Sequence, residues 1–306
     1  ARGLGITGST LLEPSVMINR SHSGRQKQAY RQPQSRACWL AASRTNEMPD
    51  TLNYSLMIAP NGARRTTADH PALPVTAADL ARTARACQLE GATAVHLHVR
   101  DDAQGHSLDP DRYRDAMAAI AEQAPGLGLQ ITTESAGRYQ PAEQLACLQA
   151  LRPAAASVAV REMAADPQVA RRAYAFADEA GIELQHILYT PACVAQLQAW
   201  RRDGLVQPTR NRVLLVLGQY VPQRDARPDD LLPLLTALKT DPARDSWHAS
   251  VCAFGALEHR CLSAAKAQGL GVRLGFENSL CDEDGRPHVD NAASLRAFLN
   301  REDRPS

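Results

Sequence analysis

Short apolar runs and helical segments alternate along the chain from Leu52 onward. The segments between the runs are 10–17 residues long and carry helix-start signals. Thr76 precedes residues 77–89, Pro141 opens residues 141–150 and Pro228 leads into residues 229–239. Glycines follow several expected helix ends, at Gly91, Gly181, Gly204 and Gly269. The apolar runs have strand length and are Tyr54–Ala59, Ala94–Val99, Leu129–Thr133, Ala156–Val160, Glu183–Leu188, Val213–Leu217, His248–Phe254 and Val272–Phe276.

Strands that alternate with helices form βαβ units around a parallel sheet. Eight such units of about 30 residues each predict a closed (β/α)8 barrel, the TIM barrel of the α/β class. We expect one barrel domain over residues 48–306, because one such barrel needs roughly 250 residues. An open doubly wound sheet is the alternative. It is weakened because no G-x-G-x-x-G follows the first run, where a dinucleotide-binding fold would need it.

Residues 1–47 differ from the rest of the chain in composition. They carry seven Arg or Lys residues against two Glu residues, a net +5, and show no sustained period of 2 or 3.6. We expect a disordered leader that need not be native, with Met48 as the natural start of the protein. An organelle transit peptide is the alternative, because the segment is rich in Arg and Ser and poor in acids.

Charge and cysteine content restrict the classes of partner. The formal net charge of +1 gives no argument for binding nucleic acid or a membrane surface, and no apolar stretch of about 18 residues is present. The seven cysteines form no C-x-x-C pair, so a zinc ribbon or a disulfide scaffold is not expected. A reduced cytoplasmic compartment fits best.

The second apolar run contains a histidine pair, in the sequence Thr-Ala-Val-His-Leu-His-Val-Arg-Asp over residues 93–101. Side chains alternate faces along a strand, so His96 and His98 share a face. In a barrel that face is the interior, and active sites of this fold lie at the C-terminal ends of the strands. The pair therefore predicts two zinc ligands. The alternative is two histidines hydrogen-bonded within the core.

A third ligand is available at the eighth run. By period 2, Arg273, Gly275 and Glu277 share a face, while Leu274 and Phe276 should pack on helices. Catalytic zinc usually takes three protein ligands, so Glu277 is predicted to complete the set. The alternative is an Arg273–Glu277 ion pair that closes the barrel.

Polar residues on two other runs are expected to face the same interior. Gln130, Thr132 and Glu134 lie opposite Ile131 on the third run. On the fourth run the inward positions are Ser157, Ala159 and Arg161. Hydroxyl groups and an arginine around a metal suit a substrate that bears a carboxylate.

These stretches resemble the β-keto acid cleavage enzymes, typified by 3-keto-5-aminohexanoate cleavage enzyme. The resemblance extends from about Leu52 to about Asn300, and H-L-H-V-R-D followed by R-x-G-F-E gives it specificity. The other matching stretches are Ile58–Ala63, Gln130–Thr133, Ala156–Glu162 and Val213–Gly218.

The resemblance implies zinc on His96, His98 and Glu277, with Arg273 in the catalytic centre. Thr132 and Ser157 are expected to contact substrate. The implied reaction condenses a β-keto acid with acetyl-CoA to give acetoacetate and a new acyl-CoA. A homo-oligomer is also expected.

Three departures from the family pattern matter. The family often has Asp where this chain has Asn278, and an asparagine cannot act as a general base. We expect Asn278 to bind substrate and Glu134 to serve as the base. Relatives that act on an amino-keto acid carry an acid at the position of Arg64, so the charge there is reversed. We therefore expect Arg64 to bind substrate and to favour a neutral or anionic far end over an ammonium group. The chain also ends soon after Asn300, where the family usually continues.

Two other functions stay open. A metal-dependent aldolase or lyase would use the same zinc without CoA. A non-catalytic barrel would keep the metal and lack turnover, for which Asn278 and the short C-terminus are the support.

Overall fold

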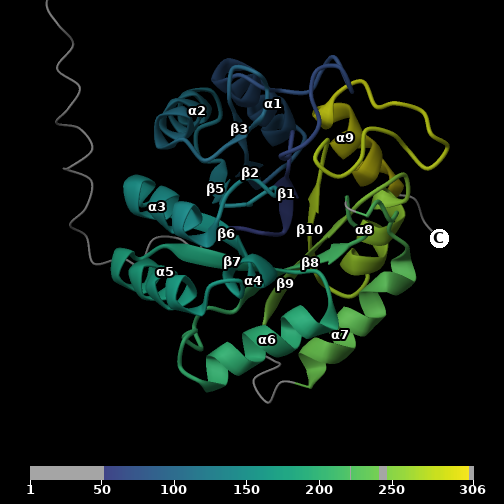
Figure 1. Ribbon diagram of the computed structural model, residues 1–306. Helices are drawn as coiled ribbons and strands as arrows, with labels where there is room; N and C mark the ends of the chain where they lie inside the picture. The colour runs from purple at the N-terminus through teal and green to yellow at the C-terminus, as the bar shows by residue number, and fades with distance from the viewer. Residues whose placement is uncertain (1–51, 221, 241–246, 303–306) are drawn as a thin grey trace, which may run out of the picture. The chain divides into compact units, whose positions relative to one another are not determined.

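A computed structural model describes residues 52–220, 222–240 and 247–302. Within these residues, eight parallel strands close into a barrel in the order β1-β10-β9-β8-β7-β6-β5-β2, with helices around it (Figure 1). The predicted (β/α)8 fold is therefore confirmed. The barrel strands are β1 (Leu56–Ile58), β2 (Ala94–Leu97), β5 (Gly128–Thr132), β6 (Ala155–Ala159), β7 (Glu183–Leu188), β8 (Arg212–Leu217), β9 (His248–Ala253) and β10 (Gly271–Leu274).

The helices begin and end where side chains satisfy their terminal backbone groups. Thr76 and Asp79 form a capping box at the start of α1, and Gly181 ends α5 in the left-handed region at φ +67°. An antiparallel pair, β3 (Val99–Arg100) and β4 (His106–Ser107), follows β2. The helices are α1 (Ala77–Leu89), α2 (Pro110–Gln123), α3 (Pro141–Leu151), α4 (Val160–Met163), α5 (Pro167–Ala180), α6 (Pro191–Arg202), 3-10 helix η1 (Pro228–Asp230), α7 (Leu231–Lys239), α8 (Glu258–Lys266) and α9 (Asn291–Glu302).

The main hydrophobic core lies between the barrel and its helices. Strand residues such as Val95, Ile131 and Val158 belong to it, as alternation requires. The opposite faces of β6 to β9 form a smaller apolar cluster inside the barrel, made of Ala159, Ile187, Leu214, Val216, Cys252 and Phe254. The interior therefore has an apolar wall on the side of β6 to β9. The histidine strand β2 lies on the other side of the closed sheet.

Several strand ends differ from the sequence expectation. Strand β10 stops at Leu274, so period 2 does not extend to Gly275, Phe276 and Glu277. Phe276 is buried, and its ring contacts His70 at 4.6 Å between centroids. Arg161 lies in the short helix α4, because β6 ends at Ala159.

Other expectations have a mixed outcome. The expected leader and its boundary at residue 48 lie outside the described residues, and they remain predictions. The described cysteines carry free thiols. In the part of the chain that the structure describes, no helix is both long and apolar enough to cross a membrane.

Candidate metal centre and substrate cavity

His96 and His98 meet inside the barrel at the C-terminal end of β2. Both side chains are buried, and their Nε2 atoms lie 3.1 Å apart. The rings are nearly perpendicular, with centroids 4.9 Å apart. Alternation along the strand accounts for this arrangement, since only Leu97 separates the two residues and it packs outward in the main core.

Glu277 reaches the histidines from a turn that follows β10. Gly275 adopts φ +137°, a backbone conformation that residues other than glycine rarely adopt. The backbone N–H of Glu277 donates to the carbonyl of Ala59 over 3.1 Å, and that of Phe276 donates to Asn291 Oδ1 over 2.9 Å. A turn pinned to neighbouring elements therefore presents this carboxylate, where the sequence suggested a continuing strand.

The three side chains form a compact donor set. Glu277 Oε2 lies 3.3 Å from His98 Nε2 and 3.8 Å from His96 Nε2. Ligands about 2.0–2.1 Å from a tetrahedral zinc ion are about 3.3 Å apart, so this spacing fits one ion. Glu277 Oε2 is buried and has no hydrogen-bond partner, as expected of a metal ligand. This buried group could hold a metal ion.

The expected alternative, an Arg273–Glu277 ion pair, is also present. Arg273 Nη2 lies 2.9 Å from Glu277 Oε1, and both side chains are buried. The pair occupies only one carboxylate oxygen, and the other oxygen faces the histidines. The ion pair and the donor set are therefore compatible.

The protonation states of Glu277 and His96 suit metal binding. Burial alone would raise the pKa of Glu277, but the Arg273 guanidinium holds it well below its usual range. Burial, reinforced by the Arg273 charge, lowers the pKa of His96 well below its usual value. A carboxylate and a neutral imidazole are the forms that bind metal ions.

A small cavity of about 50 Å³ opens beside this group. Its polar wall includes Arg273 and Thr132, and its apolar wall comes from the cluster inside the barrel. Arg273 Nε and Nη1 are buried without hydrogen-bond partners. The lining residues are Arg64, His96, Thr132, Glu134, Ala159, Arg161, Ile187, Tyr189, Val216, Gln219, Tyr220, Phe254, Arg273 and Glu277.

Arg64 and Glu134 form an ion pair in this cavity, with Arg64 Nη2 3.5 Å from Glu134 Oε1. Their side chains are 36% and 20% exposed. Burial raises the pKa of Glu134, while the Arg64 charge opposes the rise. The residue expected to read the substrate's charge therefore contacts the residue expected to act as base.

Two expected substrate contacts lie outside the cavity lining. Ser157 is buried, and its hydroxyl has no hydrogen-bond partner. Asn278 is fully buried, and neither of its side-chain polar atoms has a partner. Its carbonyl accepts from Arg65 Nη2 over 3.3 Å. The roles proposed for both side chains remain predictions.

No sequence pattern indicated a role for Tyr220 or Arg65. The Tyr220 hydroxyl donates to the carbonyl of Glu277, and the guanidinium groups of Arg64 and Arg65 lie 5.6 and 5.5 Å from the centre of its ring. Arg65 also donates to the carbonyl of Phe276. Both residues brace the turn that carries Glu277. They lie in loops, where hydrophobic periodicity carries no signal.

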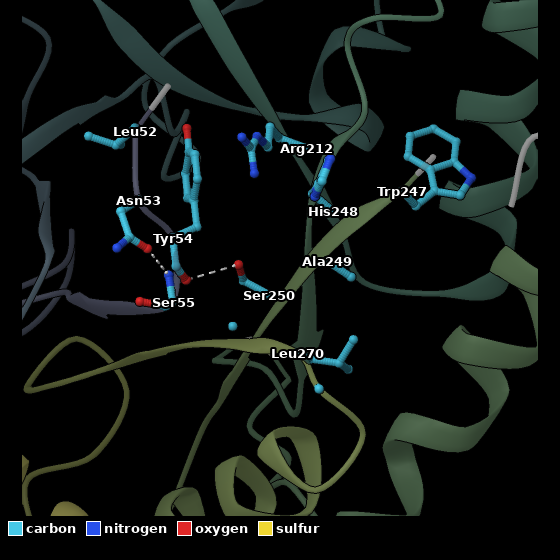
Figure 2. Close-up of a pocket in the computed structure, with 12 residues that line it drawn as sticks. Leu52, Asn53, Tyr54, Ser55, Arg212, Trp247, His248, Ala249, Ser250 and Leu270 are labelled. Atoms are coloured by element: carbon cyan, nitrogen blue, oxygen red, sulfur yellow. Dashed lines mark hydrogen bonds between the residues drawn. The ribbon is translucent and has the colours of Figure 1, made fainter. Parts of the chain in front are cut away.

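A larger hollow of about 430 Å³ lies at the opposite end of the barrel, where β1, β8, β9 and β10 begin. Figure 2 shows Tyr54, Arg212, His248 and Ser250 around it. None of the three candidate metal ligands lines it. Since (β/α)8 enzymes carry their chemistry at the C-terminal ends of the strands, the smaller cavity is the candidate active site.

Fold and donor set together define a (β/α)8 barrel with a candidate metal centre at its C-terminal face. The sequence pattern of the beta-keto acid cleavage enzymes matches residues 54–300. The chain belongs to this family.

Individual relatives match shorter stretches. Over 104 residues the chain is 35% identical to 3-oxoadipate:acetyl-CoA acetyltransferase of Cupriavidus necator, covering 34% of this chain and 36% of that protein. Over 88 residues it is 36% identical to 3-keto-5-aminohexanoate cleavage enzyme of Fusobacterium nucleatum, covering 27% and 32%. These alignments span about a third of the length of the curated relatives.

Solved structures share the fold. The complex of ObcA with oxaloacetate aligns with a TM-score of 0.59 at 16% identity, over 76% of this chain and 63% of that one. The 3-dehydroquinate dehydratase of Geobacillus kaustophilus aligns with a TM-score of 0.53 at 14% identity, over 82% and 93%.

Proposed function

We propose that this protein is a zinc-dependent enzyme that condenses a β-keto acid with acetyl-CoA, giving acetoacetate and a new acyl-CoA. The observation that carries the proposal is the buried group of His96, His98 and Glu277, because His96 and Glu277 line a cavity that Arg273 also lines. Family membership supports the reaction class. The Cupriavidus necator relative, which is named as acting with acetyl-CoA, supports the second substrate.

The cavity offers specific contacts to a β-keto acid. Zinc, when bound, would act as a Lewis acid on the keto oxygen. Arg273 has two buried nitrogen atoms without partners, which suit a substrate carboxylate through charge-assisted hydrogen bonds. The Thr132 hydroxyl accepts from the backbone N–H of Glu134 over 3.0 Å. Its own proton is therefore available to a substrate oxygen.

Glu134 is the proposed general base. It would take a proton from the substrate carbon next to the ketone, a role that Asn278 cannot fill. Its pKa is raised by burial, which makes the carboxylate a stronger base than an exposed glutamate. The Arg64 charge, 3.5 Å away, opposes this rise and positions the carboxylate.

The charge of the cavity favours an anionic or neutral substrate over an amino-keto acid. Among the described residues, its lining contains the three arginines Arg64, Arg161 and Arg273 against two glutamates. Arg161 stacks on Tyr189, 3.5 Å from the ring centre. A keto-diacid or a plain acyl chain suits this balance. The name of the Cupriavidus necator relative points to a keto-diacid for that protein.

The test is a turnover assay with zinc-loaded protein. A panel of β-keto acids with neutral, anionic and cationic far ends is incubated with and without acetyl-CoA, and acetoacetate and new acyl-CoA are measured by mass spectrometry. Acetoacetate that appears only with acetyl-CoA supports the proposal. Cleavage without CoA indicates the aldolase or lyase. Zinc binding without turnover on any substrate indicates the non-catalytic barrel.

A further inference from the structure

A chain of buried hydrogen bonds continues behind His96, away from the cavity. His96 Nδ1 lies 2.7 Å from Gln130 Oε1. Gln130 Nε2 donates to the Tyr54 hydroxyl over 3.3 Å and to Gln185 Oε1 over 3.2 Å. All four side chains are buried. Four separate segments of the barrel therefore meet at one amide.

The direction of this chain is set at its far end. The Glu183 carboxylate, whose Oε2 lies 3.9 Å from Arg212 Nε, acts electrostatically on the Tyr54 hydroxyl and, after burial, helps to raise the pKa of Tyr54. A carboxylate only accepts, so the tyrosine proton points toward Glu183. The tyrosine oxygen must then accept from Gln130, which places the Gln130 amide nitrogen away from His96. Gln130 therefore presents its carbonyl oxygen to the imidazole.

An amide oxygen can only accept, so His96 must donate from Nδ1. A neutral imidazole carries one proton, and Nε2 is then left with a free lone pair. That nitrogen lies 3.1 Å from His98 Nε2 and 3.8 Å from Glu277 Oε2. The lone pair thus lies within the candidate donor set.

We propose that Gln130 is a positioning residue that fixes His96 as the tautomer protonated on Nδ1 and orients its Nε2 for metal binding. The residues that orient Gln130 lie toward the opposite end of the barrel, because Tyr54 and Arg212 line the hollow shown in Figure 2. The inference concerns the site of the proposed function. Its test needs no turnover, so it can fail or succeed independently of the reaction.

The first measurement is zinc affinity, by competition with a chromophoric chelator. Gln130→Met keeps the volume and removes both the acceptor and the donor, and it should weaken zinc binding about 10- to 100-fold, as other losses of a histidine's second partner do. Tyr54→Phe should weaken it less, since Gln185 still accepts from Gln130. The matched control is Gln198→Met. Gln198 is also buried but donates to the carbonyl of Ala237, and zinc affinity should not change.

The second measurement is the ¹⁵N chemical shifts of histidine-labelled, zinc-free protein, with His96 assigned by its absence in His96→Gln. Wild type and Gln130→Glu, which retains the acceptor, should show a protonated Nδ1 and a free Nε2. Gln130→Met should shift His96 toward the other tautomer. If Gln130→Met does not fold, the wild-type shifts still decide. A wild-type His96 protonated on Nε2, or wild-type zinc affinity in folded Gln130→Met, would overturn the inference.

Discussion

Gly62 is the position where one methyl group should disable the candidate metal centre. It lies between β1 and α1 with φ +61°, and a Cβ atom added there would lie 2.5 Å from Glu277 Cγ and 3.2 Å from Glu277 Cα. Ordinary contact begins near 3.4 Å. Gly62→Ala must therefore push the Glu277 side chain away by about 0.9 Å, the difference between 3.4 and 2.5 Å.

A displacement of this size exceeds the roughly 0.2 Å tolerance of metal–ligand distances. We expect zinc affinity to fall at least tenfold, which is about 1.4 kcal/mol. The alanine also costs about 1–2 kcal/mol in the left-handed region, with or without zinc. In saturating zinc, the rise in Tm that zinc causes should be smaller by about 3–6 °C, at about 2–4 °C per kcal/mol for a domain of this size.

Gly181→Ala is the matched control for this substitution. Gly181 has φ +67°, and no atom lies within 4 Å of the added Cβ. It therefore carries the same backbone cost without the collision. Thermal unfolding with and without zinc, together with chelator competition, measures both variants. If Gly62→Ala and Gly181→Ala bind zinc equally well, Glu277 is not a ligand or the turn yields freely, and the reasoning is refuted.

Four further outcomes are expected. Wild-type protein should hold about one zinc per chain by elemental analysis. The double variant His96→Ala/His98→Ala should lose the zinc and keep its far-UV circular dichroism. Stoichiometric zinc in that variant would contradict the assignment. Arg64→Glu should lower the ratio of kcat/KM for anionic over cationic β-keto acids by roughly three- to tenfold, since the charge is partly screened; an unchanged ratio would remove Arg64 from substrate selection. Burial lowers the pKa of His186 to about 4, so between pH 6.5 and 4 the unfolded chain binds more protons than the folded one. The free energy of unfolding should thus fall as the pH drops through this window, by up to about 3 kcal/mol, and His186→Gln should flatten the fall in urea titrations. Deleting residues 1–47 should leave Tm and activity nearly unchanged, and a drop of many degrees would show that the segment stabilises the barrel.

The alternation of apolar and polar residues predicted correctly the orientation of side chains on regular strands. His96 and His98 flank one outward-facing leucine, so period 2 was sufficient to bring them together. Glu277 was also expected in the site, but for a reason that does not hold, because β10 ends at Leu274. The carboxylate arrives through a turn whose shape depends on Ala59 and Asn291, and both are distant from it in sequence.

The hydrophobic periodicity of the sequence could not predict contacts between distant segments. Gln130 was expected to face inward, but its partners lie on other segments, and only the register of the sheet shows which side chains share a layer. His96 pairs with Gln130, and Ser157 pairs with Gln185, as Cα neighbours across adjacent strands. The Arg64–Glu134 contact likewise joins two loops. A sequence gives the face of a residue but not its partner across the barrel.

The turn that carries Glu277 follows the last strand of the barrel, whereas the two histidines come from the second. These strands lie on either side of β1, which pairs with β2 along one edge and with β10 along the other. The donor set therefore bridges the seam at which the beginning and the end of the sheet join. A chain still being synthesised, or one whose last strand has detached, carries two of the ligands without the third. Tight metal binding should accordingly require a closed barrel. Removing the ion should destabilise the pairing of β1 with β2 and β10 before that of the other strands.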